Sequence, residues 1–170
     1  VSLHIYDLGT KKAQDVKLDK AYSDFYIPRI KWTNDANVLS AQYTNRHQNE
    51  LDLWMINAET LSGNLVLAET DKAYIDVTFN LTFLKDNSFI WTSEKDGWNH
   101  IYHYAKNGTL INQVTLGSWE VTNYYGYNQK TNRIFYQSTE DGSINRSVYS
   151  IGLNGKKKQR LTKNTGTNAA

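Results

Sequence analysis

Cysteine is absent from the 170 residues, proline occurs once, and no apolar run approaches the length of a membrane span. Without cysteine the chain can form no disulfide, no thiolate zinc site and no cysteine nucleophile. The single proline and a charged content of only 21% argue against a disordered chain. No transmembrane helix is expected. These absences favour a folded domain whose core must come from its apolar residues.

The net charge of the chain is also small. The formal net charge is +2 and the isoelectric point is near 8.6. A balance this weak gives no argument for a nucleic-acid partner or an anionic membrane. No signal peptide is recognisable at the N-terminus. Because residues 1–6 already have the pattern of a strand, we expect the chain to be cut from a longer protein.

Aromatic residues are plentiful, at 13% of the chain, and they gather in short runs. Residues 81–115 hold four such runs of β-branched and aromatic residues, each as long as a strand. The breaks between the runs contain residues suited to tight turns, such as Gly97 and Gly108. This pattern predicts a four-stranded antiparallel meander. Its centre, residues 89–91, is apolar on both faces, which predicts a sheet covered on both sides.

The meander recurs along the chain. The Asp96-Gly97 turn recurs as Asp141-Gly142 and the Asn107-Gly108 turn recurs as Asn154-Gly155, each about 45 residues later. An earlier copy with looser turns lies within residues 23–69. A period of about 40–50 residues that holds four strands is typical of β-propeller blades.

We therefore predict an all-β fold, a β-propeller fragment with about three complete four-stranded antiparallel blades and an N-terminal half blade. The half blade covers residues 1–20, and the blades cover residues 23–70, 74–117 and 121–163. Nothing in the sequence supplies inner strands for the half blade, so we expect an open arc. Its ends should expose apolar faces, which favour self-association. At the last blade the expected face includes alternate residues of 134–136 and 148–151.

Five segments carry a family resemblance by their order and spacing. They are residues 26–33, 81–86, 91–102, 117–121 and 159–162. Together they resemble the N-terminal β-propeller of dipeptidyl peptidase IV-like serine peptidases, most closely the bacterial Bacteroidetes type. The order and spacing of the segments, with Gly-Ser-Trp-Glu-Val at 117–121 after the third strand pair, make the resemblance specific.

The resemblance implies an eight-bladed propeller above an α/β-hydrolase domain, with this chain matching the propeller from late in the fourth blade through the seventh. In that family the propeller shapes a cavity that admits short peptides, which are cut two residues from the N-terminus. The implied partners are the hydrolase domain, the remaining blades and a peptide substrate. The implied location is periplasmic, cell-surface or secreted. No cofactor is expected.

Catalytic residues are not expected in this chain. The family's nucleophilic serine lies in a Gly-x-Ser-x-Gly turn between a strand and a helix, and the sequence has no such pentapeptide. The family's Glu-Glu pair, which holds the amino terminus of the substrate, is also absent. A serine-type dipeptidyl peptidase activity of the whole protein is therefore implied by the resemblance alone.

Three residues are candidates for the substrate cavity. Tyr74 and Asp76 lie in a loop that corresponds roughly to the one where mammalian relatives carry a substrate-contacting Phe-Arg pair. This loop lacks arginine, and the alternative is a solvated loop between blades. Glu120, beside Trp119, is a candidate cavity carboxylate, and the alternative is an acceptor that caps a strand or links two blades.

Two other groups of residues favour structural roles. His100 and His103 are three apart on a strand, so they point to opposite faces and are poorly placed to share a metal ion. Lys156, Lys157 and Lys158 follow a turn in the outermost strand of a blade, where lysines discourage edge-to-edge pairing. No metal site is predicted.

Two functional hypotheses remain open. The first is the non-catalytic propeller portion of a dipeptidyl peptidase IV-like enzyme, which shapes access to a hydrolase domain outside this chain. The second is a propeller scaffold that binds a protein or ligand and has no peptidase attached. A downstream Gly-x-Ser-x-Gly followed by Asp and His would favour the first.

Overall fold

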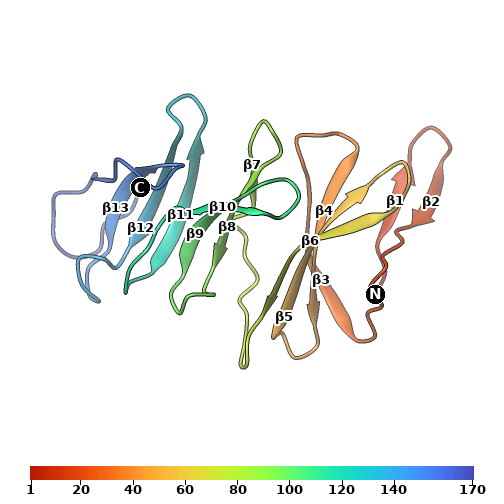
Figure 1. Ribbon diagram of the computed structural model, residues 1–170, viewed down its shortest axis with the longest axis horizontal. Helices are drawn as coiled ribbons and strands as arrows, with labels where there is room; N and C mark the ends of the chain where they lie inside the picture. The colour runs from red at the N-terminus through yellow and green to blue at the C-terminus, as the bar shows by residue number, and fades with distance from the viewer. The chain divides into compact units, whose positions relative to one another are not determined.

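The computed structural model describes all 170 residues, which form β-strands joined by turns and irregular segments (Figure 1). The chain divides into two compact units, Val1–Phe79 and Asn80–Ala170. No helix long and apolar enough to cross a membrane is present. The all-β prediction is confirmed.

The first unit holds a hairpin and one four-stranded sheet. The hairpin pairs β1 (His4–Asp7) with β2 (Lys12–Asp15). The sheet has the order β3-β4-β5-β6, antiparallel throughout. Its strands are β3 (Phe25–Trp32), β4 (Val38–Asn45), β5 (Glu50–Asn57) and β6 (Gly63–Thr70).

The second unit holds two four-stranded antiparallel sheets, each in sequence order. The first consists of β7 (Thr82–Phe83), β8 (Phe89–Ser93), β9 (His100–Tyr104) and β10 (Leu110–Gln113). The second consists of β11 (Val121–Asn128), β12 (Arg133–Ser138), β13 (Ser147–Gly152) and β14 (Gln159–Arg160). Three four-stranded sheets and an N-terminal hairpin are thus present, as the repeats predicted.

The repeated turns have a common backbone geometry. Gly97 and Gly142 both have positive φ, at 96° and 114°, and the amide of each donates to the carbonyl three residues earlier. The first sheet forms the corresponding turn with Gln48, whose φ is 56° and whose amide donates to the Asn45 carbonyl. An L-residue in this region costs roughly 1–2 kcal/mol, which glycine avoids. The earlier copy therefore has the same turn without its glycine.

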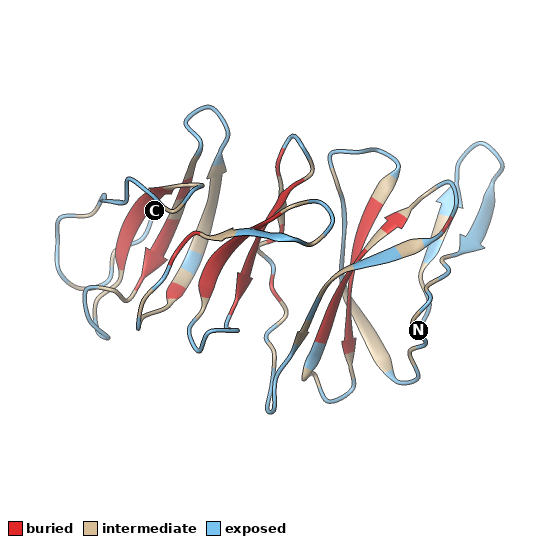
Figure 2. Cartoon of the chain, viewed as in Figure 1, coloured by how far each residue is buried: buried red, intermediate tan, exposed pale blue.

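The core of the second unit lies between its two sheets. Figure 2 shows the buried residues concentrated in the central strands of each sheet. The buried cluster consists of Leu84, Ile90, Ile101, Val114, Val121, Ile134, Tyr136, Tyr149 and Ile151. Phe89, Ile90 and Trp91 are each at most 1% exposed, which confirms that the centre of β8 is covered on both faces.

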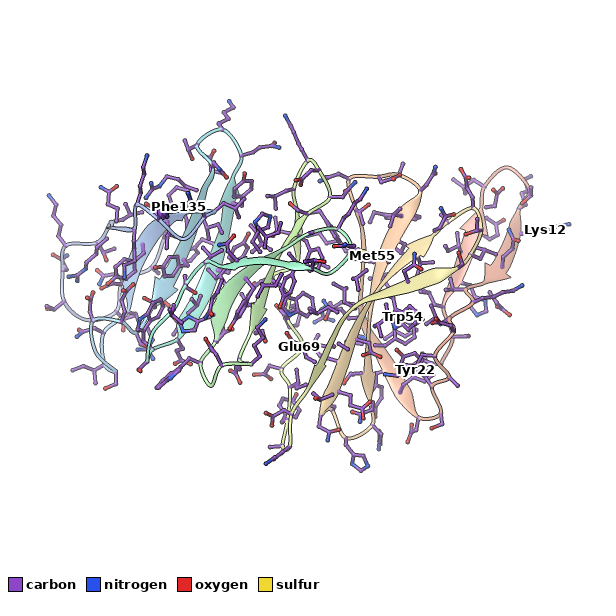
Figure 3. The ribbon with its side chains drawn as sticks, in the orientation of Figure 1. Lys12, Tyr22, Trp54, Met55, Glu69 and Phe135 are labelled. Atoms are coloured by element: carbon purple, nitrogen blue, oxygen red, sulfur yellow. The ribbon has the colours of Figure 1, made fainter.

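The core of the first unit lies between the hairpin and one face of the sheet. The sheet contributes Leu39, Ala41, Tyr43, Trp54 and Ile56. The hairpin and the segment after it contribute Leu3, Ile5, Val16, Leu18 and Tyr22, which pack against that face. Tyr22 and Trp54 lie next to each other in this core (Figure 3), and the indole N–H of Trp54 donates to the Tyr22 hydroxyl at 2.7 Å.

The last sheet corrects one expectation, because it does not expose a broad apolar face. Residues 148–151 are all buried, as are Ile134 and Tyr136, and only Phe135 is half-buried. Ile134 and Tyr136 face the core of the second unit, so their apolar surface is already covered.

The C-terminal segment also packs against this sheet. The Gln137 amide donates to the Asn168 carbonyl at 2.5 Å, and Arg146 forms a parallel bridge with Thr167. The opposite face carries Gln137 and Ser150 beside Phe135 and Val148. Val148 is buried, Phe135 is half-buried and the chain's own end covers part of this face, so it offers little apolar surface for association.

Candidate functional site

Tyr74 and Asp76 lie in the irregular segment after β6, in the first unit. The backbone of this segment is held to the sheet at two points. The amide of Ile75 donates to the Gln48 carbonyl at 2.8 Å, and the Gln42 side chain donates to the Thr78 carbonyl at 3.0 Å. Both candidate side chains are exposed, Tyr74 at 52%. The segment thus presents a phenol and a carboxylate to solvent from an anchored backbone.

The same segment ends on a second exposed aromatic residue. Phe79 is 71% exposed, and the Arg29 guanidinium of β3 lies 3.8 Å from the centroid of its ring. A cation over an aromatic face is attracted by the ring quadrupole, by about 0.5–1 kcal/mol at an exposed site. Arg29 supplies a guanidinium near this segment, whose own sequence contains Lys72 but no arginine.

Glu120 lies in the second unit, directly before β11, and its side chain is half-buried. Its backbone makes the contacts: the amide of Glu120 donates to the Thr139 hydroxyl, and the Glu120 carbonyl accepts from the Thr139 amide, both at 3.1 Å. The backbone therefore links β11 to the turn after β12, while the carboxylate makes no hydrogen bond or ion pair. Tyr74 and Asp76 share one segment, whereas Glu120 belongs to the other unit.

Trp119 is the structural centre of the Gly-Ser-Trp-Glu-Val run. Its ring meets His100 edge-on at a centroid distance of 4.8 Å and stacks against Tyr136 at 6.3 Å. Gly117 is needed beside it, because a Cβ there would lie 2.1 Å from the indole nitrogen and φ at that position is +149°. The run thus places the Trp119 ring between His100 of one sheet and Tyr136 of the other sheet of the second unit.

Ser88, His103 and Asp86 lie together in the second unit and resemble a hydrolytic triad in composition. The Ser88 hydroxyl lies 2.6 Å from an Asp86 carboxylate oxygen and 2.9 Å from His103 Nε2. Since a carboxylate only accepts, Ser88 donates its proton to Asp86 and His103 donates to Ser88. In an activated nucleophile the histidine accepts the serine proton, so the direction of these hydrogen bonds is the reverse. Ser88 is only 3% exposed, and its hydrogen bond to His103 joins the start of β8 to β9.

This buried histidine predicts a pH dependence of stability. Burial lowers the pKa of His103 from 6.5, although Asn112 and Asp86 act in the opposite direction. The unfolded chain then takes up the proton more readily, so stability should fall as the pH drops below about 6.5, by at most about 1.4 kcal/mol per pH unit. Thermal melts between pH 7.5 and 5.5 should show this decrease, and His103→Gln should flatten it. Equal slopes in both proteins would contradict the prediction.

His100 is also fully buried, at 0% exposed, and both of its ring nitrogens have protein partners. Nδ1 lies 3.0 Å from the Thr115 hydroxyl and Nε2 lies 3.0 Å from the Gly117 carbonyl. Since a carbonyl only accepts, Nε2 carries the proton. These contacts agree with a structural role for the residue.

The lysine run after the last turn is partly neutralised. Lys158 forms an ion pair with Glu140, and its ammonium lies 5.7 Å from the ring centroids of both Trp119 and Tyr149. Arg160 forms a second ion pair with Asp141. These contacts, together with the short β14, tie the edge of the last sheet to the turn between β12 and β13, and Lys158 is not simply a solvated edge residue.

Comparison with known proteins shows the family. The family model described as the N-terminal region of dipeptidyl peptidase IV (DPP IV) matches residues 1–170. The chain belongs to this DPP IV N-terminal family. The family resemblance drawn from the five segments is confirmed.

Among solved structures, dipeptidyl peptidase 4 of Porphyromonas gingivalis is similar to 98% of this DPP IV N-terminal chain, with 36% identity and a TM-score of 0.89. A putative dipeptidyl aminopeptidase IV from Bacteroides ovatus is 23% identical over 92% of the chain, with a TM-score of 0.77, and supports the fold. Among curated relatives, a probable dipeptidyl-aminopeptidase B of Pyrenophora teres f. teres is 27% identical over 98% of the chain.

This DPP IV N-terminal chain spans only part of these relatives. It covers 20% of the Pyrenophora protein and 24% of the Porphyromonas chain. Sequence reasoning found the family and the run around Trp119 but missed Arg29 near the exposed segment. Arg29 lies about 50 residues before Phe79 in the sequence. The two meet because the segment after β6 packs against the sheet that contains β3.

Proposed function

We propose that this chain is the non-catalytic propeller portion of a dipeptidyl peptidase IV-like serine exopeptidase, which shapes substrate access to an α/β-hydrolase domain outside these 170 residues. The match of the whole chain to the DPP IV N-terminal family is the observation that carries the proposal. The sequence lacks a Gly-x-Ser-x-Gly turn. Ser88, which contacts His103, is buried and donates its proton to Asp86, whereas Ser2, which lies 2.8 Å from His4 Nε2, is exposed before β1 and outside any such turn. The chemistry therefore belongs to the rest of the protein.

The exposed segment after β6 is the proposed contribution to the substrate cavity. A phenol at Tyr74 and a carboxylate at Asp76, held on an anchored backbone, suit a short peptide with a charged amino terminus, because a carboxylate pairs with an ammonium group. The Glu120 carboxylate, which has no protein partner, is a further candidate. The proposed partners are the hydrolase domain, the other blades and the peptide substrate.

The proposed location rests on the family resemblance alone. Dipeptidyl peptidases of this kind act on peptides, and we propose that the whole protein is periplasmic, cell-surface or secreted. Isolated from the rest of its protein, the chain is proposed to self-associate through apolar side chains left uncovered in the first unit, since the last sheet offers few.

Kinetics of the full-length protein test the cavity residues. Tyr74→Ala and Asp76→Ala should each raise KM for a dipeptidyl p-nitroanilide about fivefold, which corresponds to about 1 kcal/mol of lost binding, and should leave kcat nearly unchanged. Lys72→Ala, an exposed residue of the same segment, is the matched control and should leave both constants unchanged. Unchanged KM in both variants would remove this segment from the cavity.

A further inference from the structure

The sequence contains two Asn-Gly pairs, Asn107-Gly108 and Asn154-Gly155, and both lie in turns of the second unit. The first turn joins β9 to β10, and the second joins β13 to β14. The glycine has positive φ in each, at 85° in the first and 74° in the second. Both asparagines are exposed. Because the two pairs have the same local chemistry, a difference in their reactivity has to come from their surroundings.

The hydrogen bonds inside the two turns follow one pattern. The amide of Gly108 donates to the Ala105 carbonyl at 2.9 Å, and the amide of Gly155 donates to the Gly152 carbonyl at 2.8 Å. The side-chain oxygen of each asparagine accepts from the backbone amide two residues later, at 3.1 Å in both turns. A further backbone hydrogen bond closes each turn, at 2.8 Å in the first and 2.9 Å in the second. The turns are therefore matched in their internal geometry.

The β13–β14 turn is also attached to neighbouring strands. The Asn112 side chain of β10 donates to the Leu153 carbonyl at 3.1 Å. The Arg133 guanidinium of β12 donates to the Lys157 carbonyl at 2.8 Å. Gly155 itself packs so closely that an added Cβ would lie 3.1 Å from a backbone carbonyl oxygen directly after β10. This turn is thus anchored from two other strands of the unit.

The β9–β10 turn is held differently. The hydrogen bonds that hold residues 105–109 run within the turn itself. Lys106, Asn107 and Thr109 are all exposed. A segment with few tertiary contacts opens locally at a lower free-energy cost than a segment that is bonded to its neighbours. We therefore expect the β9–β10 turn to open more often than the β13–β14 turn.

Opening of the turn matters for the deamidation of asparagine, which starts at the next backbone nitrogen. The Gly108 nitrogen attacks Cγ of Asn107, and a C–N bond forms while the bond from Cγ to the side-chain nitrogen breaks. The attacking nitrogen gives up its proton, and the side-chain nitrogen takes up a proton and leaves as ammonia. Water then opens the cyclic imide to aspartate or isoaspartate. Glycine has no Cβ to obstruct the attack, but the closed turn holds its N–H on the Ala105 carbonyl.

We propose that Asn107 is a site of spontaneous deamidation in the folded protein and that the anchored turn protects Asn154. The product carries a carboxylate beside Lys106 where the chain had an amide. In the isoaspartate form the backbone of the turn is one carbon longer, which disturbs the pairing of Tyr104 with Leu110 at the turn. This chemistry is independent of the proposed role in a peptidase.

Peptide mapping by mass spectrometry tests the proposal. The 170-residue chain, shown to be folded by circular dichroism, is incubated at mildly alkaline pH. Samples taken over time are digested, and the fraction of each asparagine converted to aspartate or isoaspartate is measured. The chain unfolded in guanidinium chloride is incubated in parallel. Asn154 is the internal control, because it has the same Asn-Gly chemistry in a matched turn.

In the folded chain Asn107 should be converted at least about tenfold faster than Asn154, because the attack requires local opening of the turn. In guanidinium chloride the two rates should agree within about twofold, since both turns are then lost. Equal rates in the folded chain, or a faster rate at Asn154, would overturn the proposal. A tenfold difference that persists in guanidinium chloride would overturn it as well, because the flanking sequence and not the fold would then be its cause.

Discussion

Replacing Trp54 with alanine should lower the free energy of unfolding by about 3–5 kcal/mol, the range for truncating a fully buried aromatic residue. Trp54 is 0% exposed in the core between the hairpin and the first sheet. The truncation also removes the donor to the Tyr22 hydroxyl, which lies 2.7 Å from the indole nitrogen. Urea denaturation followed by circular dichroism measures the loss.

Trp32→Ala is the matched control for this prediction. Trp32 lies on the same face of the same sheet but is 51% exposed, so its removal from the 170-residue chain should cost less than about 1 kcal/mol. Comparable losses for the two tryptophans would contradict the packing described here, because they would place Trp32 in a core of its own.

Replacing Asp52 with alanine should cost about 2–3 kcal/mol, because it leaves buried polar partners without an acceptor. Asp52 is 3% exposed on β5 and accepts from Tyr22 and from Lys20, the latter at 2.6 Å. Burial, and then the Asp52 carboxylate, raise the pKa of Tyr22, so its hydroxyl stays protonated and donates. The Lys20 side chain is 40% exposed, so solvent screens its share of the interaction.

Asp52→Asn separates the hydrogen bond from the charge. The amide oxygen still accepts from Tyr22 but no longer forms an ion pair with Lys20, so the loss should be clearly smaller than that of Asp52→Ala. Denaturation midpoints of the two variants give the comparison. An equally large loss for Asp52→Asn would show that the ion pair with Lys20, and not the accepted hydrogen bond, stabilises this site.

The sheets could be predicted because the sequence repeats its turn chemistry. Gly97 and Gly142 occupy the same left-handed position in successive sheets, and glycine is the residue that adopts it without strain. The first sheet was harder to delimit because Gln48 and Leu61 hold positive φ without glycine. Strand length was least predictable at the sheet edges, where β7 and β14 are each two residues long.

The candidate site was less predictable than the fold. An exposed loop such as the Tyr74 segment has no periodic pattern, so its sequence does not indicate the orientation of its side chains. The Arg29–Phe79 contact joins distant positions and has no local signal. The expectation of an exposed apolar face on the last sheet was wrong. The alternation of apolar and polar residues along β13 did not indicate that residues 148–151 are all buried. It also gave no sign that the C-terminal segment hydrogen-bonds to Gln137.

The most direct test of the central claim is a peptidase assay of the purified 170-residue chain with a Gly-Pro chromogenic substrate, alongside the full-length protein. A serine peptidase needs an activated nucleophile, its base and an oxyanion hole in one site. Ser88 is buried and donates to Asp86, and Ser2, which lies 2.8 Å from His4 Nε2, is exposed before β1 and belongs to no Gly-x-Ser-x-Gly turn. We predict no release above background from the chain and clear turnover by the full-length protein. Turnover by the chain that survives repurification and is blocked by a serine-directed inhibitor would contradict a non-catalytic role.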